Sequence, residues 1–289
     1  MSAIPTPQTA APTPHALRPT PSREADNHAD KLKSEADFFN RHYTAEAAAG
    51  ITPLSNADRH RYTAPPADTV YPREFVFHCL APLHHKTLLE IASGNGIDAN
   101  LAAHNGATVY TYDVSPASND LVNRRATVNQ LTDRIHTTVA AHPDEAANHF
   151  NLQQVDHILG YAALHHLPDW QGLGPTLYHR LKPGGSAVFA EPTSNSPFLR
   201  WLRNRVPLAI DEMTDDETPL TDRDLLAFAA PFDRVTVRHF QLTARLWRLW
   251  PHRPKLAATL HHLDAKLLRL CPPMKRFCTV TVLACHRDS

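Results

Sequence analysis

The sequence predicts an α/β protein with a doubly wound sheet that is mostly parallel and has an antiparallel strand near the C-terminus. Short apolar runs suited to buried strands alternate with helix-compatible segments between residues 86 and 192. Strands that alternate with helices along a chain form parallel sheets with helices on both faces. Two further strand-like runs, at residues 235–240 and 278–285, follow without this alternation.

The stretch that organises the chain is residues 87–98. It opens with a short apolar run that suits a buried strand, and Glu90 adds an acceptor-only group near the carboxyl end of that strand. In the turn at residues 92–96, Gly94 and Gly96 can take backbone angles closed to other residues and leave no Cβ in a ligand's way. A strand, a glycine turn and a helix together allow backbone N–H groups to approach a nucleotide-like ligand.

A second acid follows at the end of the next expected strand. The β-branched and aromatic run at residues 107–112 ends at Asp113, which lies 17 positions beyond Gly96. This is near the spacing at which an acid meets ribose hydroxyls. Ser115 and Pro116 then supply an N-cap and a first-turn proline for a helix. Further strands are expected at residues 135–140, 155–160 and 186–191.

The regions outside this core differ in composition. Residues 1–30 hold six prolines between Pro5 and Pro21, and we expect a disordered tail there. Residues 31–289 are expected to form one domain. Its parts are a helical cap at 31–85 with helices at 37–43 and 71–78, a ligand-binding core at 86–192, and C-terminal strands at 193–289. This last part includes an acidic loop at 211–217, a capping box of Thr221 and Asp224, and a helical insertion at 247–274.

The overall composition excludes several classes of protein. The chain has 289 residues, 42% hydrophobic and 20% charged, and its 29 basic and 29 acidic side chains balance, so no nucleic-acid partner is expected. No apolar run reaches membrane-spanning length, and none resembles a signal peptide. The four cysteines form no C-x-x-C pair, and we read them as reduced thiols of a cytoplasmic protein.

Taken together, these motifs resemble those of the class I S-adenosylmethionine-dependent methyltransferases, which have a Rossmann-like fold. Residues 88–96, Leu-Leu-Glu-Ile-Ala-Ser-Gly-Asn-Gly, are similar to the family's first motif, and Asp113 falls where the family has its ribose-binding acid. Residues 163–167, Ala-Leu-His-His-Leu, resemble the signature after strand four of small-molecule members. Residues 181–185 are similar to the turn before strand five. Residues 191–192 and 216–220 are similar to one bacterial subgroup of uncharacterised methyltransferases.

The resemblance, which runs from about residue 35 to the C-terminus, implies S-adenosylmethionine as cofactor and a set of residues that bind it. This set is Glu90, Ala92, Ser93, Gly94, Gly96, Asp113, Val114, Ala141, His142 and Tyr161. The chain departs from the family at two places. Ala92 stands where the first motif usually begins with glycine. After strand three, where the family often places an acid beside the adenine, the stretch at residues 141–144 is Ala-His-Pro-Asp, which leaves the adenine contacts open.

The resemblance further implies methyl transfer to a small-molecule acceptor, and we expect the methylated atom to be an oxygen. Such a displacement needs no metal. A neutral hydroxyl becomes a better nucleophile when a general base removes its proton. His165 or His166 could serve, and Glu191 could bind substrate or orient a histidine. The alternative is that the histidines cap a turn or pack beside the cofactor, and that Glu191 is a hydrogen-bonded turn residue. Tyr161 is expected to line the pocket for the adenosyl group.

Other functions stay open as alternatives. Residues 94–99 also fit the G-x-G-x-x-A fingerprint of NAD-dependent oxidoreductases, but that fingerprint asks for no acid like Glu90, and some 85 residues precede the strand. A second alternative is a module that binds the cofactor without catalysis. A metal site is not expected, because the side chains of the adjacent histidine pairs diverge and no acid or cysteine completes a ligand set.

The C-terminal insertion combines leucines with positive charge. Between Arg245 and Arg276 the chain has eight lysines and arginines against one acid, Asp264. Its leucines recur on one helical face, at Leu256, Leu260, Leu263, Leu267 and Leu270. We expect this stripe to pack on the domain as a structural insertion. The alternative is peripheral contact with anionic membranes, with Trp247 and Trp250 at the interface.

Overall fold

A computed structural model describes residues 21–167, 169–199, 219–249 and 252–288. Among these residues, seven strands form one sheet in the order β3-β2-β1-β4-β5-β7-β6. The strands are β1 (Thr87–Ile91), β2 (Thr108–Asp113), β3 (Ile135–Val139), β4 (Val155–Tyr161), β5 (Leu181–Pro192), β6 (Arg234–Phe240) and β7 (Val280–His286). The proline-rich residues 1–20, the acidic loop at 211–217 and Trp250 lie outside the described residues.

The direction of the strands matches the prediction. Strands β1 to β5 pair in parallel, whereas β7 lies antiparallel between β5 and β6. Strand β1 sits between β2 and β4, so the chain order reverses at β1 and β4. Ligands of doubly wound sheets bind beyond the carboxyl ends of the strands at such a reversal. The Rossmann-like fold expected from the sequence is therefore confirmed, including the antiparallel C-terminal strand.

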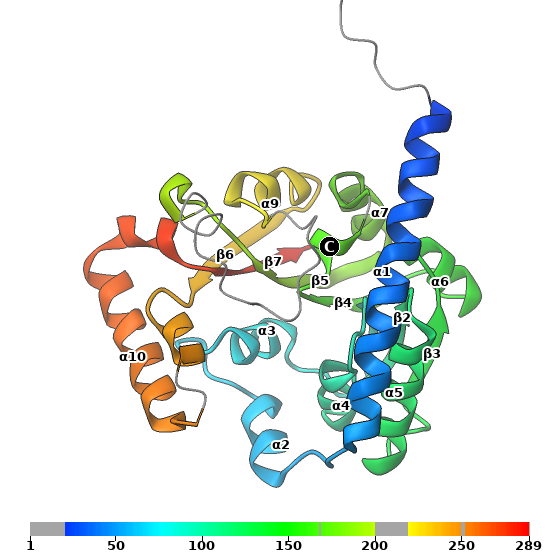
Figure 1. The fold of residues 1–289 in the computed structure, drawn as a ribbon, viewed down its shortest axis with the longest axis horizontal. Coiled ribbons are helices and arrows are strands. Elements are labelled where there is room, and N and C mark those ends of the chain that lie inside the picture. The colour runs from blue at the N-terminus through cyan, green and yellow to red at the C-terminus, as the bar shows by residue number, and fades with distance from the viewer. Residues whose placement is uncertain (1–20, 168, 200–218, 250–251, 289) are drawn as a thin grey trace, which may run out of the picture.

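Helices cover both faces of the sheet (Figure 1). One core packs α3 (Pro72–Leu80), α4 (Ile97–His104) and α5 (Pro116–Val128) against the sheet, with Phe77, Leu80 and Val122 fully buried. The other core packs α6 (Pro143–His149), α7 (Leu173–Arg180) and α9 (Asp222–Phe228), with Leu177 and Phe228 buried. The capping box predicted for α9 forms between Thr221 and Asp224.

Helix α1 (Pro21–Ala49) differs from the expectation for the N-terminus. The sequence predicted a tail through residue 30 and a short helix at 37–43, whereas one 29-residue helix covers residues 21–30 of that tail and the whole of the short helix. The helix runs across the carboxyl edge of the sheet, in front of α5 in Figure 1. The short α2 (Asn56–Thr63) then leads to α3, and its N-cap is Ser55. None of the helices in the described part of the chain combines the length and apolar character needed to cross a bilayer.

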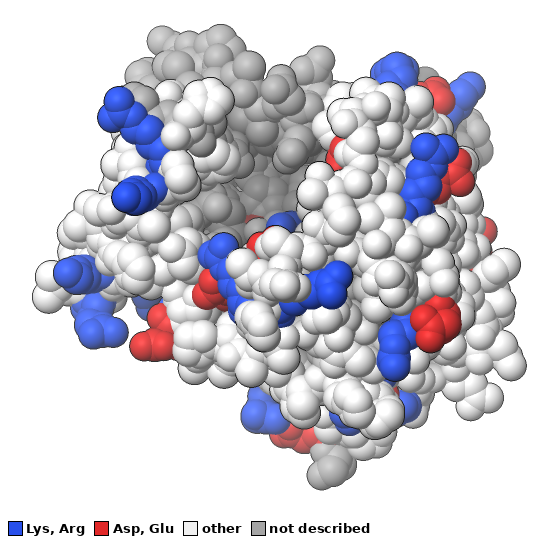
Figure 2. All heavy atoms as spheres, turned by 90° about the horizontal axis from the view of Figure 1, so that it is seen from below, with Lys and Arg blue, Asp and Glu red and all other residues white. Residues whose placement is uncertain are grey.

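The C-terminal insertion also differs from the expectation. It consists of η3 (Ala244–Leu249), α10 (Pro254–Leu270) and η4 (Pro272–Phe277), and it lies at the outer edge of the molecule. The leucine stripe is buried only in part: Leu256, Leu260 and Leu267 are half-buried, whereas Leu263 is 42% exposed and Leu270 is 82% exposed. The buried residues of α10 are His261 and Asp264. Lys and Arg side chains gather on the side where α10 lies (left in Figure 2).

Candidate functional site

The glycine turn after β1 is held in a tight left-handed path. Ala92, Gly94 and Gly96 have φ angles of 51°, 52° and 73°. A Cβ on Gly96 would come within 2.7 Å of the Val122 side chain, and one on Gly94 would come within 2.8 Å of the Tyr43 hydroxyl. Alanine adopts a left-handed conformation at a cost of about 1–2 kcal/mol. The turn is thus enclosed by α5 on one side and by α1 on the other.

Asp113 ties the end of β2 to this turn. Its carboxylate oxygens accept hydrogen bonds from the backbone N–H groups of Gly94 (3.0 Å) and Ser115 (2.9 Å), and the residue is 6% exposed. Burial raises the pKa of Asp113, while these two backbone hydrogen bonds oppose the rise. The Ser118 hydroxyl also lowers the pKa of Asp113, and because each carboxylate oxygen has two acceptor positions, Asp113 retains acceptor capacity for a ligand.

A second group of charges lies beside the same turn. Burial, together with the nearby carboxylates of Asp98 and Asp113, raises the pKa of Glu90 well above its usual value. Asp98 forms an ion pair of 3.0 Å with the guanidinium of Arg73, and this guanidinium stacks over the Tyr161 ring at 4.5 Å. Arg73 therefore brings a half-buried positive charge to the ends of β1 and β4.

Sequence reasoning missed Arg73, because it lies on α3, outside every motif. The segment at residues 71–78 was expected to form a helix before the sheet, and it does so as α3. Its periodicity showed which residues are apolar but not which polar side chain would turn inward. Arg73 becomes recognisable as a site residue only through its contacts with Asp98 and Tyr161.

A short histidine–carboxylate contact lies after β4, in η1 (Leu164–His166). Nδ1 of His165 is 2.7 Å from Oε2 of Glu191, and Glu191 is fully buried at the end of β5. The other carboxylate oxygen accepts the backbone N–H groups of Ala163 and Leu164, both at 2.9 Å. A carboxylate only accepts, so Nδ1 carries the proton and Nε2 has the lone pair. Glu191 therefore orients the imidazole of His165.

His166 faces the other way, toward α1. Its Nδ1 lies 3.3 Å from Oε2 of Glu35, and its ring makes an edge contact with Phe39 at 5.1 Å. The His166 side chain also contributes to lowering the pKa of Asp113, against the larger effect of burial. Sequence reasoning missed Glu35 and Tyr43, although Glu35, Phe39 and Tyr43 recur every four residues and so share a helix face.

The remaining predicted residues also lie at the carboxyl ends of the strands. Ser93 is buried in the turn, and Val114 is half-buried directly after Asp113. His142 is the N-cap of α6 and accepts the N–H of Asp144, while the N–H of Ala141 bonds to Glu145. The described residues contain no cluster of three or more His, Cys, Asp or Glu side chains that could hold a metal ion.

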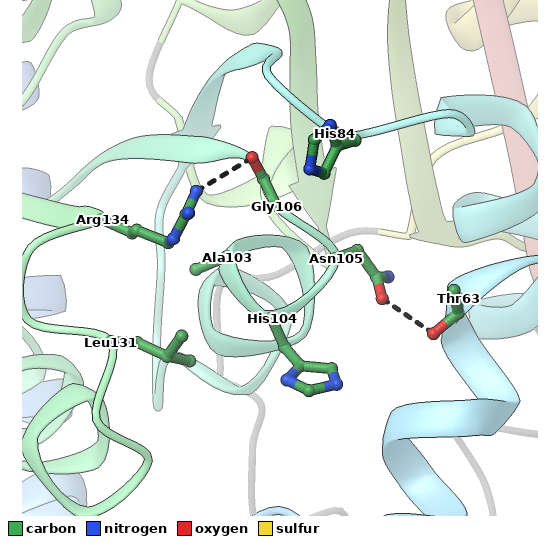
Figure 3. Close-up of a pocket in the computed structure, with 8 residues that line it drawn as sticks. All are labelled: Thr63, His84, Ala103, His104, Asn105, Gly106, Leu131 and Arg134. Atoms are coloured by element: carbon green, nitrogen blue, oxygen red, sulfur yellow. Dashed lines mark hydrogen bonds between the residues drawn. The ribbon is translucent and has the colours of Figure 1, made fainter.

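A cavity of about 360 Å³ lies at the opposite end of the strands (Figure 3). Figure 3 shows His84, Gly106 and Arg134 around it, and these precede β1, β2 and β3 respectively. Arg134 donates a hydrogen bond to the carbonyl of Gly106 at 3.1 Å. Because ligands of doubly wound sheets bind at the carboxyl ends, this cavity is separate from the candidate site.

Comparison with known proteins agrees with this geometry. A family model described as "Methyltransferase domain" matches residues 39–250. The chain resembles the geranyl diphosphate C-methyltransferase of Streptomyces coelicolor A3(2), in complex with Mg²⁺, geranyl diphosphate and S-adenosyl-L-homocysteine. The TM-score is 0.56 at 16% identity, over 89% of this chain and 98% of that one.

Two further solved structures share the fold at low sequence identity. Phosphoethanolamine N-methyltransferase 2 of Haemonchus contortus gives a TM-score of 0.53 at 15% identity, over 88% of this chain and 60% of that one. The [4+2]-cyclase SpnF gives 0.51 at 13% identity, over 83% and 84%. No sequence among the curated proteins matches the chain significantly.

Proposed function

Because the chain belongs to the methyltransferase-domain family, its reaction is methyl transfer from S-adenosylmethionine, and we propose that it methylates a small-molecule acceptor at oxygen. The observation that carries the choice of oxygen is the His165–Glu191 pair, joined at 2.7 Å at the carboxyl edge of the sheet. A neutral hydroxyl must lose a proton as it is methylated, and an oriented imidazole can take that proton.

The residues around the glycine turn fit this cofactor. The remaining acceptor capacity of Asp113 suits ribose hydroxyls, and the backbone of Gly94 and Gly96 suits the methionine part. Arg73 offers a half-buried cation for the cofactor's carboxylate, and Glu90 an acid for its ammonium. For the adenine we assign residues 141–142 after β3.

The protein contributes to the reaction by positioning the reactants and by accepting one proton from the acceptor. When bound, S-adenosylmethionine supplies an electrophilic methyl group on a positively charged sulfur. His165 receives the acceptor's proton at Nε2, and the carboxylate of Glu191 stabilises the imidazolium that forms. Helix α1 closes over the turn through Tyr43 and limits the access of water.

We also assign the enzyme to the cytoplasm. Its four cysteines are unpaired thiols. Burial raises the pKa of Cys79 to about 11 and those of Cys278 and Cys285 to about 12. These three side chains therefore stay protonated and unreactive at neutral pH, as suits structural thiols in a reducing compartment.

Ligand binding tests the cofactor assignment. At a hundred times its dissociation constant, S-adenosylhomocysteine should stabilise the fold by ~2.7 kcal/mol, measured as a rise in melting temperature, whereas NAD should give none. Asp113→Ala should raise the dissociation constant at least about tenfold, because two hydrogen bonds to a charged acceptor are lost. A shift with NAD alone, or unchanged affinity in the variant, contradicts the assignment.

Turnover tests the catalytic assignment. With a panel of hydroxyl, amine and carbon acceptors, we expect production of S-adenosylhomocysteine with a hydroxyl compound. His165→Gln should lower kcat by about 10²–10⁴-fold while leaving cofactor affinity intact. The control is His239→Gln, because His239 makes a matching 2.7 Å contact with Asp222 at the far edge of the sheet. Turnover that prefers amines, or that survives His165→Gln, rules out the base. Cofactor binding without turnover on the whole panel would instead favour a non-catalytic module.

A further inference from the structure

The surface formed by η3, α10 and η4 carries unpaired positive charge, and we call it the basic surface. Seven lysines and arginines elsewhere in the described residues form ion pairs with acids. The exposed bases of the basic surface have no such partner among the described residues. They are Arg253, Lys255, Lys266, Arg269, Lys275 and Arg276.

The one acid within this surface does not neutralise it. Asp264 is 3% exposed, and its carboxylate accepts the backbone N–H groups of Leu242 (2.8 Å), Thr243 (2.7 Å) and Ala244 (3.0 Å). Asp264 therefore anchors α10 to the chain that leads into η3. The charge on the outside of α10 is left to the solvent or to a partner.

The same surface exposes leucines that the fold does not bury. Leu246 is 44% exposed and Leu249 is 55% exposed in η3, while Leu263 is 42% and Leu270 is 82% exposed in α10. A hollow of about 230 Å³ between β6 and α10 shows that the helix does not close against the sheet. An apolar area next to unpaired charge indicates a contact with another molecule.

Helical geometry brings these two properties together on the outer side of α10. Leu263 and Leu270 are seven residues apart and so lie on one line, and Lys266 lies between them, about 50° away around the helix. His261 and Asp264, the buried residues, lie on the opposite side. His261 contacts the Tyr71 ring at 4.8 Å and helps to hold the helix in this orientation.

We propose that the basic surface docks the enzyme onto an anionic lipid membrane, with α10 parallel to the membrane plane. Leucines beside a row of lysines and arginines are typical of helices that lie in a bilayer interface. A two-fold dimer through this surface would bring its own positive charges together. A nucleic acid would pair the charges but would leave Leu270 exposed to water. An anionic bilayer satisfies both kinds of side chain.

The direct test is co-sedimentation of the full-length protein with vesicles. We expect binding to phosphatidylcholine vesicles that contain phosphatidylglycerol, and no binding to phosphatidylcholine alone. Because each base near an anionic surface adds a salt-sensitive contribution, binding should fall when the salt is raised to ~1 M. Failure to bind the anionic vesicles at low salt overturns the proposal, as does equal binding to both kinds.

Two double variants separate the apolar contribution from the charged one. Leu263→Gln with Leu270→Gln, and Lys266→Glu with Arg269→Glu, should each weaken binding about 30-fold or more. The matched controls are Leu226→Gln on α9, where the leucine is 51% exposed, and Arg124→Glu on α5, where the arginine is exposed. Neither control should change binding, and circular dichroism should show that all variants fold.

Three outcomes assign the basic surface to another partner and overturn the proposal. The first is that the leucine variant binds vesicles as well as the parent. The second is that the protein binds duplex DNA more tightly than anionic vesicles and the leucine substitutions have no effect. The third is that the protein sediments as a dimer that Leu263→Gln with Leu270→Gln converts to a monomer.

Discussion

Helices α1 and α10 differ in polarity, and the location of each in the fold is the reverse of what its polarity suggests. Helix α1 is rich in polar and charged residues, yet Glu35 is buried and Asn40 accepts hydrogen bonds from the Ser115 hydroxyl and the Ala117 N–H. Helix α10 has a regular leucine stripe, yet Leu263 and Leu270 stay exposed. The polar helix thus lies against the site, and the amphipathic helix lies at the edge of the molecule.

The difference lies in which side chains meet unsatisfied polar groups. The first turn of α5 has backbone N–H groups without helical partners, and Asn40 of α1 supplies an acceptor for one of them. Glu46 of α1 also forms an ion pair of 3.1 Å with the largely buried Arg125. Helix α10 is held by Asp264 and His261, its buried residues, while Leu263 and Leu270 stay exposed. Hydrophobic periodicity therefore predicts that a helix forms, but polar contacts decide where these two helices lie.

The largest effect is expected at the anchor of α10. Asp264→Ala removes the acceptor of three backbone N–H groups and of the Thr243 hydroxyl, and buried donors left unsatisfied are costly. We expect the free energy of unfolding in urea to fall by about 3 kcal/mol. Affinity for S-adenosylhomocysteine should not change, because α10 lies away from the turn. If the binding free energy of S-adenosylhomocysteine fell by more than the free energy of unfolding, α10 would contribute to the cofactor site as α1 does. The contrast between the two helices would then be wrong.

An intermediate effect is expected from Glu90, the buried acid of β1. Because the pKa of Glu90 is raised in the folded state, the folded protein keeps a proton that the unfolded chain has released. Its contribution is fully present below about pH 4.5 and is lost as the pH rises toward the folded pKa, by at most about 1.4 kcal/mol per pH unit.

The variant Glu90→Gln removes this titration. Urea unfolding of the ligand-free protein between about pH 5 and pH 8 should therefore show a shallower decline of stability in the variant. Glu145→Gln is the control, because Glu145 lies on the exposed first turn of α6. Equal slopes in the parent and in Glu90→Gln would show that Glu90 titrates at its ordinary pKa in the folded protein. Burial would then have no effect on the pKa of this acid.

The smallest effect is expected for a single contact of α1. Asn40→Ala removes the acceptor for Ser115 and Ala117, directly after Asp113, and should cost about 1 kcal/mol. If α1 closes the cofactor site, this cost appears as an approximately fivefold weaker affinity for S-adenosylhomocysteine in titration calorimetry. Asn123→Ala, on the exposed side of α5, should leave affinity unchanged. An unaltered affinity in Asn40→Ala would mean that α1 is only attached to the domain.

The sequence predicted those parts of the molecule that local chemistry determines. The buried strands, the glycine turn and the capping box at Thr221 follow from spacing and residue type within short windows, and each is confirmed. The pairing of His165 with Glu191 was one of several alternatives, because 26 residues separate them and only the adjacency of β4 and β5 brings them together. Arg73 and the packing of α1 depend wholly on tertiary contacts, so no window contains them.

The left-handed alanines at the ends of β1 and β4 have a consequence for the thermodynamics of binding. Ala92 and Ala162 have φ angles of 51° and 52°, a conformation that glycine would adopt more readily. An alanine samples fewer backbone conformations than a glycine, so a turn that contains it loses less conformational entropy when a ligand arrives. These two residues therefore preorganise the carboxyl edge, exchanging some stability of the free protein for a smaller entropic cost of binding.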